Sequence, residues 1–503
     1  MRSTFMGLET NKRGMFTQQS GLYTVGHNIS NANTLGYSRQ RVNMETTTPY
    51  PGIGLNSGTT PGFIGTGVHA SSIQRIRDVF VDRQFRQESN NLGYWESRSG
   101  AISQIEDIVT EPSSHGLNES MNQFWKSLQD LSDSPESSAA RRVVVERGVA
   151  VAESFNYLHK QLTEIQSNLK NEINVSTDRV NSIFKQIAEL NDQIKKIEPN
   201  GYMPNDLYDS RDMLLDELST YFPIEVEYEK SGGNALAIAE GSVTVRIKTN
   251  GQSIEVINGK DFAKMSSNLS KDKAYEDFTE FVFTGTANVT GGTVDYSGLV
   301  KGKGKMLSLI DSYGYGSDQG VYPEMLKNLR DMATSFANDF NAAHRNGYEF
   351  NSANQAGDFF DLTNIGPDEL LKVHNDIIND PNKIGASDRP NEEGNGKNSL
   401  LLAERQTAQI NIGGTTTTIQ TFYQSMIGKL GVDGQQANKM AFNSATLQLS
   451  VENRRASISS VSLDEEMTDM IKFQQAYNAS ARMITVVDET LDRIINGMGR
   501  VGQ

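Results

Sequence analysis

The chain has 503 residues, of which 62 are acidic and 47 basic, so its formal net charge is −15. This charge disfavours nucleic acid and anionic membranes as partners, because both repel negative charge. The chain contains no cysteine, which excludes disulfides, thiolate metal sites and cysteine nucleophiles. No apolar run has the length of a membrane span or of a secretion signal, so neither is expected. The length predicts about three domains.

Apolar residues near the N-terminus recur at a spacing of seven. They are Leu8, Met15, Leu22 and Ile29, and Val25 follows three residues after Leu22. A single narrow apolar stripe of this kind predicts a helix that pairs with another helix.

The C-terminal segment carries a longer pattern of the same kind. Ser462 and Glu465 fit a capping box, and Gly497 is expected to end the helix that follows. Apolar residues at heptad spacing predict a coiled-coil seam along this helix. The seam has two interleaved series, which are Met470, Tyr477, Ile484, Leu491 and Met498, and Phe473, Ser480, Val487 and Ile494.

The middle of the chain changes pattern twice. Helical spacing between residues 80 and 200 predicts long paired helices, which end at Pro199 and Gly201 before a further helix starts near residue 204. Residues 222–305 contain segments that alternate in polarity, as strands do, together with many glycines and little helical spacing. Helical spacing then returns from Tyr322 to Ala343, with Gly347 as the expected C-terminal glycine.

These patterns predict a mainly α-helical protein with a β-rich insertion. A long antiparallel bundle or coiled coil forms the terminal domain, and the middle region is mixed α/β. The domains are discontinuous in sequence. The expected division is 1–60 with 455–503 for the terminal helical domain, 61–221 with 306–454 for a helical bundle with β elements, and 222–305 for an inserted outer β-rich domain.

The sequence shows no constellation of catalytic, cofactor-binding or metal-binding residues. The six histidines form no H-E-x-x-H pair, and the Gly-Lys pairs lack the other residues of a Walker motif. His344, at the end of a predicted helix, is expected to pack or to face the helix dipole rather than to act as a base. Ser182 and Lys185 have the S-x-x-K spacing but lie on the polar face of a predicted helix. An enzymatic role is therefore not expected.

An asparagine-rich segment, GHNISNANTLGYSRQRV, follows the first predicted helix from Gly26 to Val42. Asparagine side chains can bond the free carbonyls of a helix end, and Gly36 permits a positive φ at a sharp change of direction. The segment resembles the N-terminal motif of the flagellar axial proteins, which include the rod, hook and hook-associated proteins. The matching residues are Asn31, Ala32, Asn33, Thr34, Gly36 and Tyr37.

The C-terminus provides a second match to the same family. Residues 462–495, SLDEEMTDMIKFQQAYNASARMITVVDETLDRII, resemble its closing helix. Three internal strings, at 204–219, 340–348 and 394–431, are similar to the members that join hook to filament. Hook and rod proteins have only the two terminal motifs in common with this chain, and not the three internal strings. The likeness omits residues 225–300, and Lys397 and Asn398 depart from the usual residues of the family.

The resemblance implies a structural subunit of the bacterial flagellum at the hook–filament junction. It also implies export by the flagellar type III apparatus without a cleaved signal peptide, and head-to-tail assembly in an extracellular helical lattice. The implied partners are further copies of the chain, the hook protein, a second junction protein and the filament protein. Whether an export chaperone binds the C-terminal helix stays open. No cofactor, nucleic acid or membrane is implied.

The terminal helices are expected to pair as an inner-tube domain whose narrow seam is completed by neighbouring subunits. The residues expected in assembly are Leu8, Met15, Leu22, Val25, Ile29, Met470, Phe473, Tyr477, Ile484, Val487, Leu491 and Ile494. Two alternatives in the same setting are another axial subunit, such as the hook or distal rod protein, and an exported enzyme on a flagellar scaffold. The enzyme alternative needs an active site within 222–305, where there is no histidine or cysteine. A third is a coiled-coil interaction protein unrelated to flagella.

Overall fold

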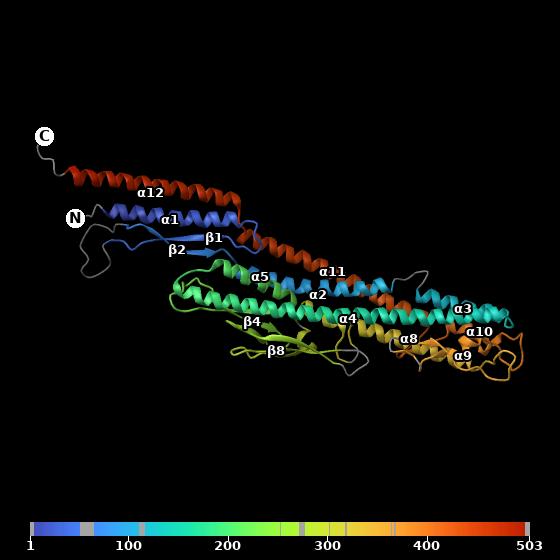
Figure 1. Cartoon of the computed structure of the whole chain (residues 1–503). Coiled ribbons are helices and arrows are strands. Elements are labelled where there is room, and N and C mark those ends of the chain that lie inside the picture. Colours follow the sequence, from blue (N-terminus) through green and yellow to red (C-terminus); the bar gives the residue numbers. More distant parts are fainter. Residues whose placement is uncertain are drawn as a thin grey trace.

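A computed structural model describes residues 5–50, 65–109, 116–251, 253–270, 277–300, 302–316, 319–363, 365–366 and 369–497. Over these residues the molecule is elongated, with long helices along its length and both ends of the chain at one tip (Figure 1). Among the described helices, none has the length and hydrophobicity of a membrane span. The prediction of a mainly helical protein with a β-rich insertion is confirmed.

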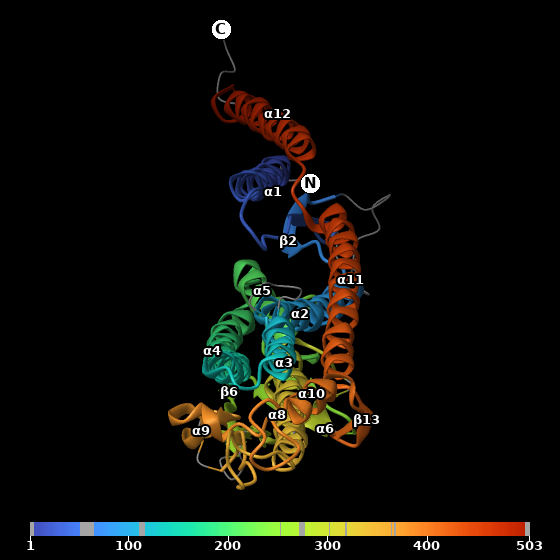
Figure 2. The same ribbon diagram turned by 90° about the vertical axis from the view of Figure 1, so that its right-hand side faces the viewer.

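The two terminal helices lie side by side, as predicted. They are α1 (Phe5–Ser30) and α12 (Leu463–Gly497), and α12 packs along α1. Between α1 and the body lies an antiparallel hairpin of β1 (Gln40–Thr46) and β2 (Val68–Arg75). Figure 2 shows that the helix pair stands apart from the body. The hairpin and the short link between α11 and α12 join the two parts.

The body is built around α4 (Ser138–Ile197), a helix of 60 residues. Its start is capped by Ser137, and the chain turns after it at Gly201, whose φ is 86°, so the predicted stop is confirmed. The longest helix after it, α11 (Ile419–Ser459), packs along α2. The other helices are α2 (Val79–Ile108), α3 (Leu117–Asp133), α5 (Asn205–Tyr221), α7 (Lys305–Tyr313), α8 (Val321–His344), α9 (Asn375–Asn379) and α10 (Lys397–Glu404), with 3-10 turns at Glu198–Asn200, Pro381–Lys383 and Arg405–Thr407.

The predicted β-rich insertion contains two antiparallel sheets. The first, in the order β3-β4-β5-β6, is made of β3 (Ile224–Glu229), β4 (Ser242–Lys248), β5 (Ser253–Asn258) and β6 (Asp261–Phe262). The second, β7-β8-β9, is made of β7 (Lys264–Ser270), β8 (Asp277–Thr284) and β9 (Gly292–Asp295), and is followed by the short helix α6 (Tyr296–Leu299). Both sheets lie along α4, and their buried residues belong to the same hydrophobic core as those of α4.

An aromatic cluster closes the end of the body farthest from the termini. Phe124 contacts the rings of Phe336, Phe340 and Phe359, with centroids 5.2 to 6.4 Å apart. Short hairpins cover this end, β10 (Phe360–Asp361) with β11 (Lys372–Val373) and β12 (Ile410–Ile412) with β13 (Thr415–Thr417).

His344 is a packing residue, as predicted. It is fully buried, its Nδ1 lies 2.8 Å from the carbonyl of Gly357, and its Nε2 accepts from the amide of Gly385. The prediction for Gly347 is wrong: its φ is not in the left-handed region. Gly347 is instead required for space, because a Cβ there would lie 2.4 Å from the carbonyl oxygen of Gly385.

Candidate assembly surface

Glycines spaced seven apart on α1 face α12. A Cβ on Gly21 would lie 3.0 Å from Phe473, one on Gly14 would lie 3.4 Å from Ser480, and one on Gly7 would lie 3.8 Å from Val487. Each step toward the start of α1 is matched by an equal step toward the end of α12, so the helices are antiparallel. Because glycine has no side chain, the two backbones approach closely along this line.

The predicted seam residues lie along this helix pair with different degrees of burial. Val25 is 4% exposed and Leu491 8%, whereas Ile494 is 39% exposed. Met498 lies outside the described residues. The others are half-buried, and they are Leu8, Met15, Leu22, Ile29, Met470, Phe473, Tyr477, Ile484 and Val487. Within one chain, α1 therefore covers much of the predicted seam but not all of it.

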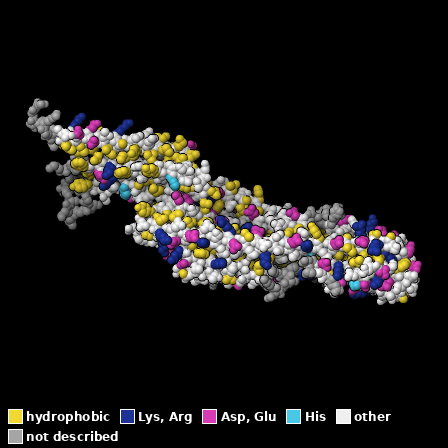
Figure 3. All heavy atoms as spheres, in the orientation of Figure 1, with side chains coloured by type: hydrophobic (Ala, Val, Ile, Leu, Met, Phe, Trp, Pro, Cys, Tyr) yellow, Lys and Arg dark blue, Asp and Glu magenta, His cyan; other side chains and the backbone are white. Residues whose placement is uncertain are grey.

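Large apolar side chains of α12 flank the seam on both sides. By helical spacing, Met467 and Ile471 lie on one side and Met483 and Val486 on the other. Their exposed fractions are 57%, 54%, 51% and 51%. Figure 3 shows apolar side chains gathered over this helix pair. We call these four residues the flanking residues. Sequence reasoning missed them because it followed a single stripe.

The exposed side of α1 also carries two large apolar side chains. Phe16 and Tyr23, seven residues apart, are 53% and 70% exposed. Exposed apolar surface of this extent is typical of an interaction site.

Asn28 ties the end of α1 to β1 and to α12. It is 1% exposed, and its Oδ1 accepts from the hydroxyl of Tyr37 at 2.8 Å and the amide of Gln40 at 3.0 Å. Its Nδ2 donates to the carbonyl of Gln40 at 2.9 Å and to Glu466 Oε2 at 3.0 Å. One side chain thus fixes the start of α12 against the end of α1.

The six residues of the family motif form the turn around this tie. As predicted, Asn31 donates to a helix-end carbonyl, that of His27, at 3.1 Å, and Gly36 has a φ of +79°. Gly36 also lies against Met213 of α5, where a Cβ would be 2.3 Å from the sulfur. Thr34 donates to Asn31, Tyr37 to Asn28, Ala32 is half-buried and Asn33 is exposed. Burial, together with the carboxylates of Asp206, Asp209 and Glu466, raises the pKa of Tyr37, so its hydroxyl stays a donor.

Arg39 provides a second tie between β1 and α12. Its Nε donates to Glu466 at 2.7 Å and its Nη1 to Glu465 at 2.5 Å, while its amide donates to the carbonyl of Ser459. The predicted capping box needs the carboxylate of Glu465 to bond back to the backbone of Ser462. In the structure that carboxylate binds Arg39 instead.

A buried ionic network joins the hairpin to the body. Asp212 of α5, 2% exposed, accepts from Arg75 at 2.9 Å, Arg77 at 3.0 Å and Arg86 at 3.1 Å. Asp216 on the same face of α5 binds Arg86 at 2.8 Å and Arg455 of α11 at 2.5 Å. Burial alone would raise the pKa of Asp212, but Arg77, Arg75 and Arg86 hold it far below its usual range. The network was not predicted, because its partners come from separate segments.

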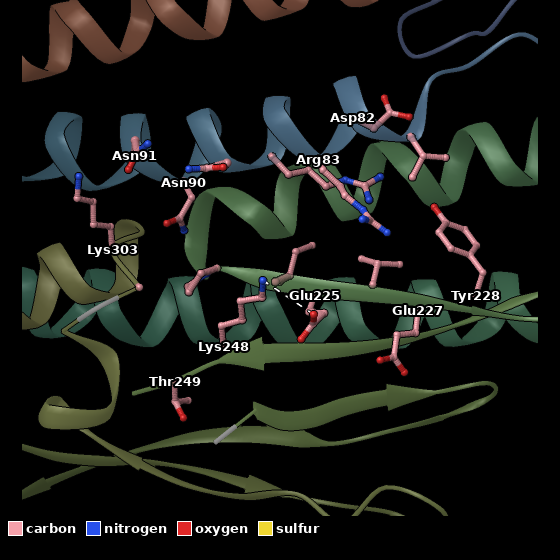
Figure 4. A pocket seen from close by; sticks show the side chains of 17 residues that line it. Asp82, Arg83, Asn90, Asn91, Glu225, Glu227, Tyr228, Lys248, Thr249 and Lys303 are labelled. Carbon is pink, nitrogen blue, oxygen red and sulfur yellow. Dashed lines mark ion pairs between the residues drawn. The ribbon is translucent and has the colours of Figure 1, made fainter. Parts of the chain in front are cut away.

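Beside this network, α2 and β3 enclose a groove of about 850 Å³. Figure 4 shows Arg83, Asn90 and Asn91 of α2 on one wall, and Glu225 and Tyr228 of β3 on the other. Among the described residues, no group of three or more His, Asp or Glu is placed to hold a metal ion.

These features define a class of protein: an elongated helical protein whose terminal helices pair at one tip and keep large apolar side chains exposed. Two family models match the chain, the flagellar hook-associated protein FlgK helical domain at residues 102–360 and the flagellar basal body rod FlgEFG protein C-terminal at residues 454–497.

Curated relatives show the particular family. The flagellar hook-associated protein 1 of Bacillus subtilis is 44% identical over the full length of both chains. That of Escherichia coli is 24% identical, over 96% of this chain and 98% of its own length. The chain belongs to the flagellar hook-associated protein 1 family. It is therefore a structural component of the bacterial flagellum and not an enzyme, as predicted.

A solved structure has the same fold. It is that of the flagellar hook junction protein FlgK from Burkholderia pseudomallei, at a TM-score of 0.62 and 12% identity, covering 75% of this chain and all of that one.

Proposed function

We propose that this chain forms the junction between flagellar hook and filament, as a structural subunit that packs head to tail with further copies in a helical lattice. Its membership of the hook-associated protein 1 family supports the position at the junction. The exposed apolar surface of the terminal helix pair supports head-to-tail packing. The hook protein, a second junction protein and the filament protein are the proposed neighbours. We also propose the C-terminal helix as the site of an export chaperone.

The observation that carries this proposal is the position of the flanking residues on both sides of α12. A closed dimer needs one apolar face, whereas a subunit within a lattice has neighbours on two sides. Burying one such side chain contributes about 1 to 2 kcal/mol when it starts half exposed. Several contacts of this size, repeated along the helical lattice, suffice to hold an assembly.

The predicted seam residues keep their proposed role in assembly on the same basis. The half-buried ones, such as Ile484 and Met470, leave part of their surface for a neighbour. Val25 and Leu491 are already covered within the chain, so we assign them a supporting role in holding α1 against α12.

We propose the domain division 1–60 with 455–503, 61–221 with 306–454, and 222–305. The pairing of α1 with α12 supports the first domain, and the confinement of β3 to β9 to one segment supports the third.

The test is a charge placed on each flank of α12. Ile471→Asp and Val486→Asp should be exported and should melt at the temperature of the unchanged protein, while cells lack filaments. Gln475→Asp is the matched control, because Gln475 is exposed on the side of α12 opposite the seam. Cells of both flank variants that grow normal filaments would refute the assembly mode.

A deletion strain separates the junction role from that of another axial subunit. Loss of a junction protein should leave complete hooks and release filament protein into the medium. Loss of a hook or distal rod protein should leave no hooks at all.

A further inference from the structure

A second pocket, of about 440 Å³, lies between α2, α8 and α11, away from the terminal pair. Its lining is rich in aromatic rings. Tyr94 and Trp95 come from α2. Tyr296 is the first residue of α6, and Tyr315 follows the end of α7. All four are half-buried, so each ring presents part of its surface to the pocket.

The rings are held in place by contacts among themselves. Tyr94 and Trp95 meet edge to face, with centroids 5.0 Å apart, and Tyr296 stacks on Tyr315. The hydroxyl of Tyr94 donates to Asp311 at 2.8 Å, and Arg98 lies 3.3 Å from the same hydroxyl. The walls of the pocket are therefore preorganised, which lowers the entropy lost when a ligand binds.

The charges of the lining do not balance. Asp311 is paired with Arg98 at 3.5 Å, and Glu324 with Lys429 at 2.5 Å. Asp433 of α11 also lines the pocket, and among the described residues it has no ion-pair partner. Three carboxylates thus face two cationic side chains.

Aromatic faces and an unpaired carboxylate together select a cation with flat apolar faces. A guanidinium group stacks on rings through its planar faces and bonds a carboxylate through its edge. One cation already lies over a ring of this group, because Lys303 is 5.7 Å from the ring centroid of Trp95. An anion would meet Asp433, and a neutral ring would leave that carboxylate unpaired.

We propose that this pocket binds a guanidinium group, with Asp433 as its counter-ion and Trp95 as its stacking surface. The group comes either from an arginine side chain on a polypeptide or from a free alkylguanidine. The proposal is independent of the junction role, since none of its residues belongs to the terminal helices.

The experiment uses the full-length chain and the fluorescence of its two tryptophans. The probes are the tripeptide Ac-Gly-Arg-Gly-NH2, its citrulline counterpart, which is a neutral isostere, and n-propylguanidinium. The arginine peptide should change the fluorescence of Trp95 saturably, and the citrulline peptide should not. Trp125 is buried in the core at 3% exposed, so Trp95→Phe should remove the response.

Asp433→Asn should weaken binding of the arginine peptide about three- to fivefold, measured by calorimetry. Asp488→Asn, at an exposed position of α12, is the control and should bind like the unchanged chain. Tighter binding of the peptide assigns the pocket to a polypeptide side chain, and tighter binding of n-propylguanidinium assigns it to a free guanidine. Equal responses to arginine and citrulline peptides, or unchanged affinity in Asp433→Asn, would overturn the proposal.

Discussion

Replacing Gly21 with alanine tests whether close approach of α1 and α12 holds the terminal pair. A Cβ at this position would lie 3.0 to 3.1 Å from three atoms of the Phe473 ring, including Cγ at its base. The ring cannot move away by a simple rotation of its far end, so the helices must separate or the ring must change rotamer. Overpacking of this kind costs about 1 to 3 kcal/mol.

The control is Gly26, in the same helix, where an added Cβ would meet nothing within 4 Å. Replacing glycine with alanine in a helix interior stabilises it by about 1 kcal/mol through backbone entropy. Gly26→Ala should therefore strengthen α1, whereas in Gly21→Ala the clash offsets or exceeds the same gain. The two variants should differ by about 1 to 3 kcal/mol in the stability of the pair.

The three glycines of α1 that face α12 provide a graded comparison, because the space for an added Cβ increases from Gly21 to Gly7. Contact distances relax from 3.0 Å at Gly21 to 3.4 Å at Gly14 and 3.8 Å at Gly7, so Gly7→Ala should behave like the control. The assay is hydrogen exchange of the α1 and α12 amides in the monomer, which reports local opening. Phe473→Leu in the Gly21→Ala background should restore protection. Equal protection in Gly21→Ala and Gly26→Ala would show that close packing at Gly21 does not hold the pair.

Three further outcomes follow from the burial of charged and apolar groups. Asp212→Asn should lower the free energy of unfolding in urea by about 3 to 5 kcal/mol, because three buried arginines lose a partner. The control is Asp206→Asn, which should change this free energy by less than about 1 kcal/mol because the Asp206 side chain is 68% exposed. Burial lowers the pKa of His344 to about 4, so on acidification the unfolded chain binds a proton before the folded chain does. The free energy of unfolding, measured by urea titration, should therefore fall as the pH drops from about 6.5 to 4. His344→Gln should remove the contribution of this residue to the fall. Leu491→Asp should increase exchange of the α1 amides in the monomer, because it places a charge at a position that is 8% exposed; unchanged exchange would mean that the seam is filled only in the assembly.

Periodicity predicted the long helices because each buries one continuous face. The stripe from Phe155 through Leu162 and Leu169 is the buried face of α4, and its stop at Pro199 follows from local backbone chemistry alone. Gly36 was predictable for the same reason, since a positive φ is a local requirement.

Contacts between distant segments were not predictable. The carboxylates of Asp209, Asp212 and Asp216 share one face of α5, which the spacing shows, but a polar helix face is usually solvated. Only the fold brings Arg75 from a strand end and Arg86 from α2 onto that face. Gly347 was misassigned for the same reason, because its space is limited by Gly385, which is far along the chain.

The terminal pair is tied at its base and becomes looser toward its tip. At the base, Asn28 and Arg39 hold Glu466, and Gly21 allows the closest contact between the helices. Toward the tip the contact at Gly7 widens to 3.8 Å, and the exposed apolar side chains Met483 and Val486 lie in that outer part of α12. A chain of this design keeps the direction of the helix pair fixed relative to the body. Its tip is the part with the fewest contacts that fix it to the rest of the chain, so packing of neighbouring subunits should stabilise the tip more than the base.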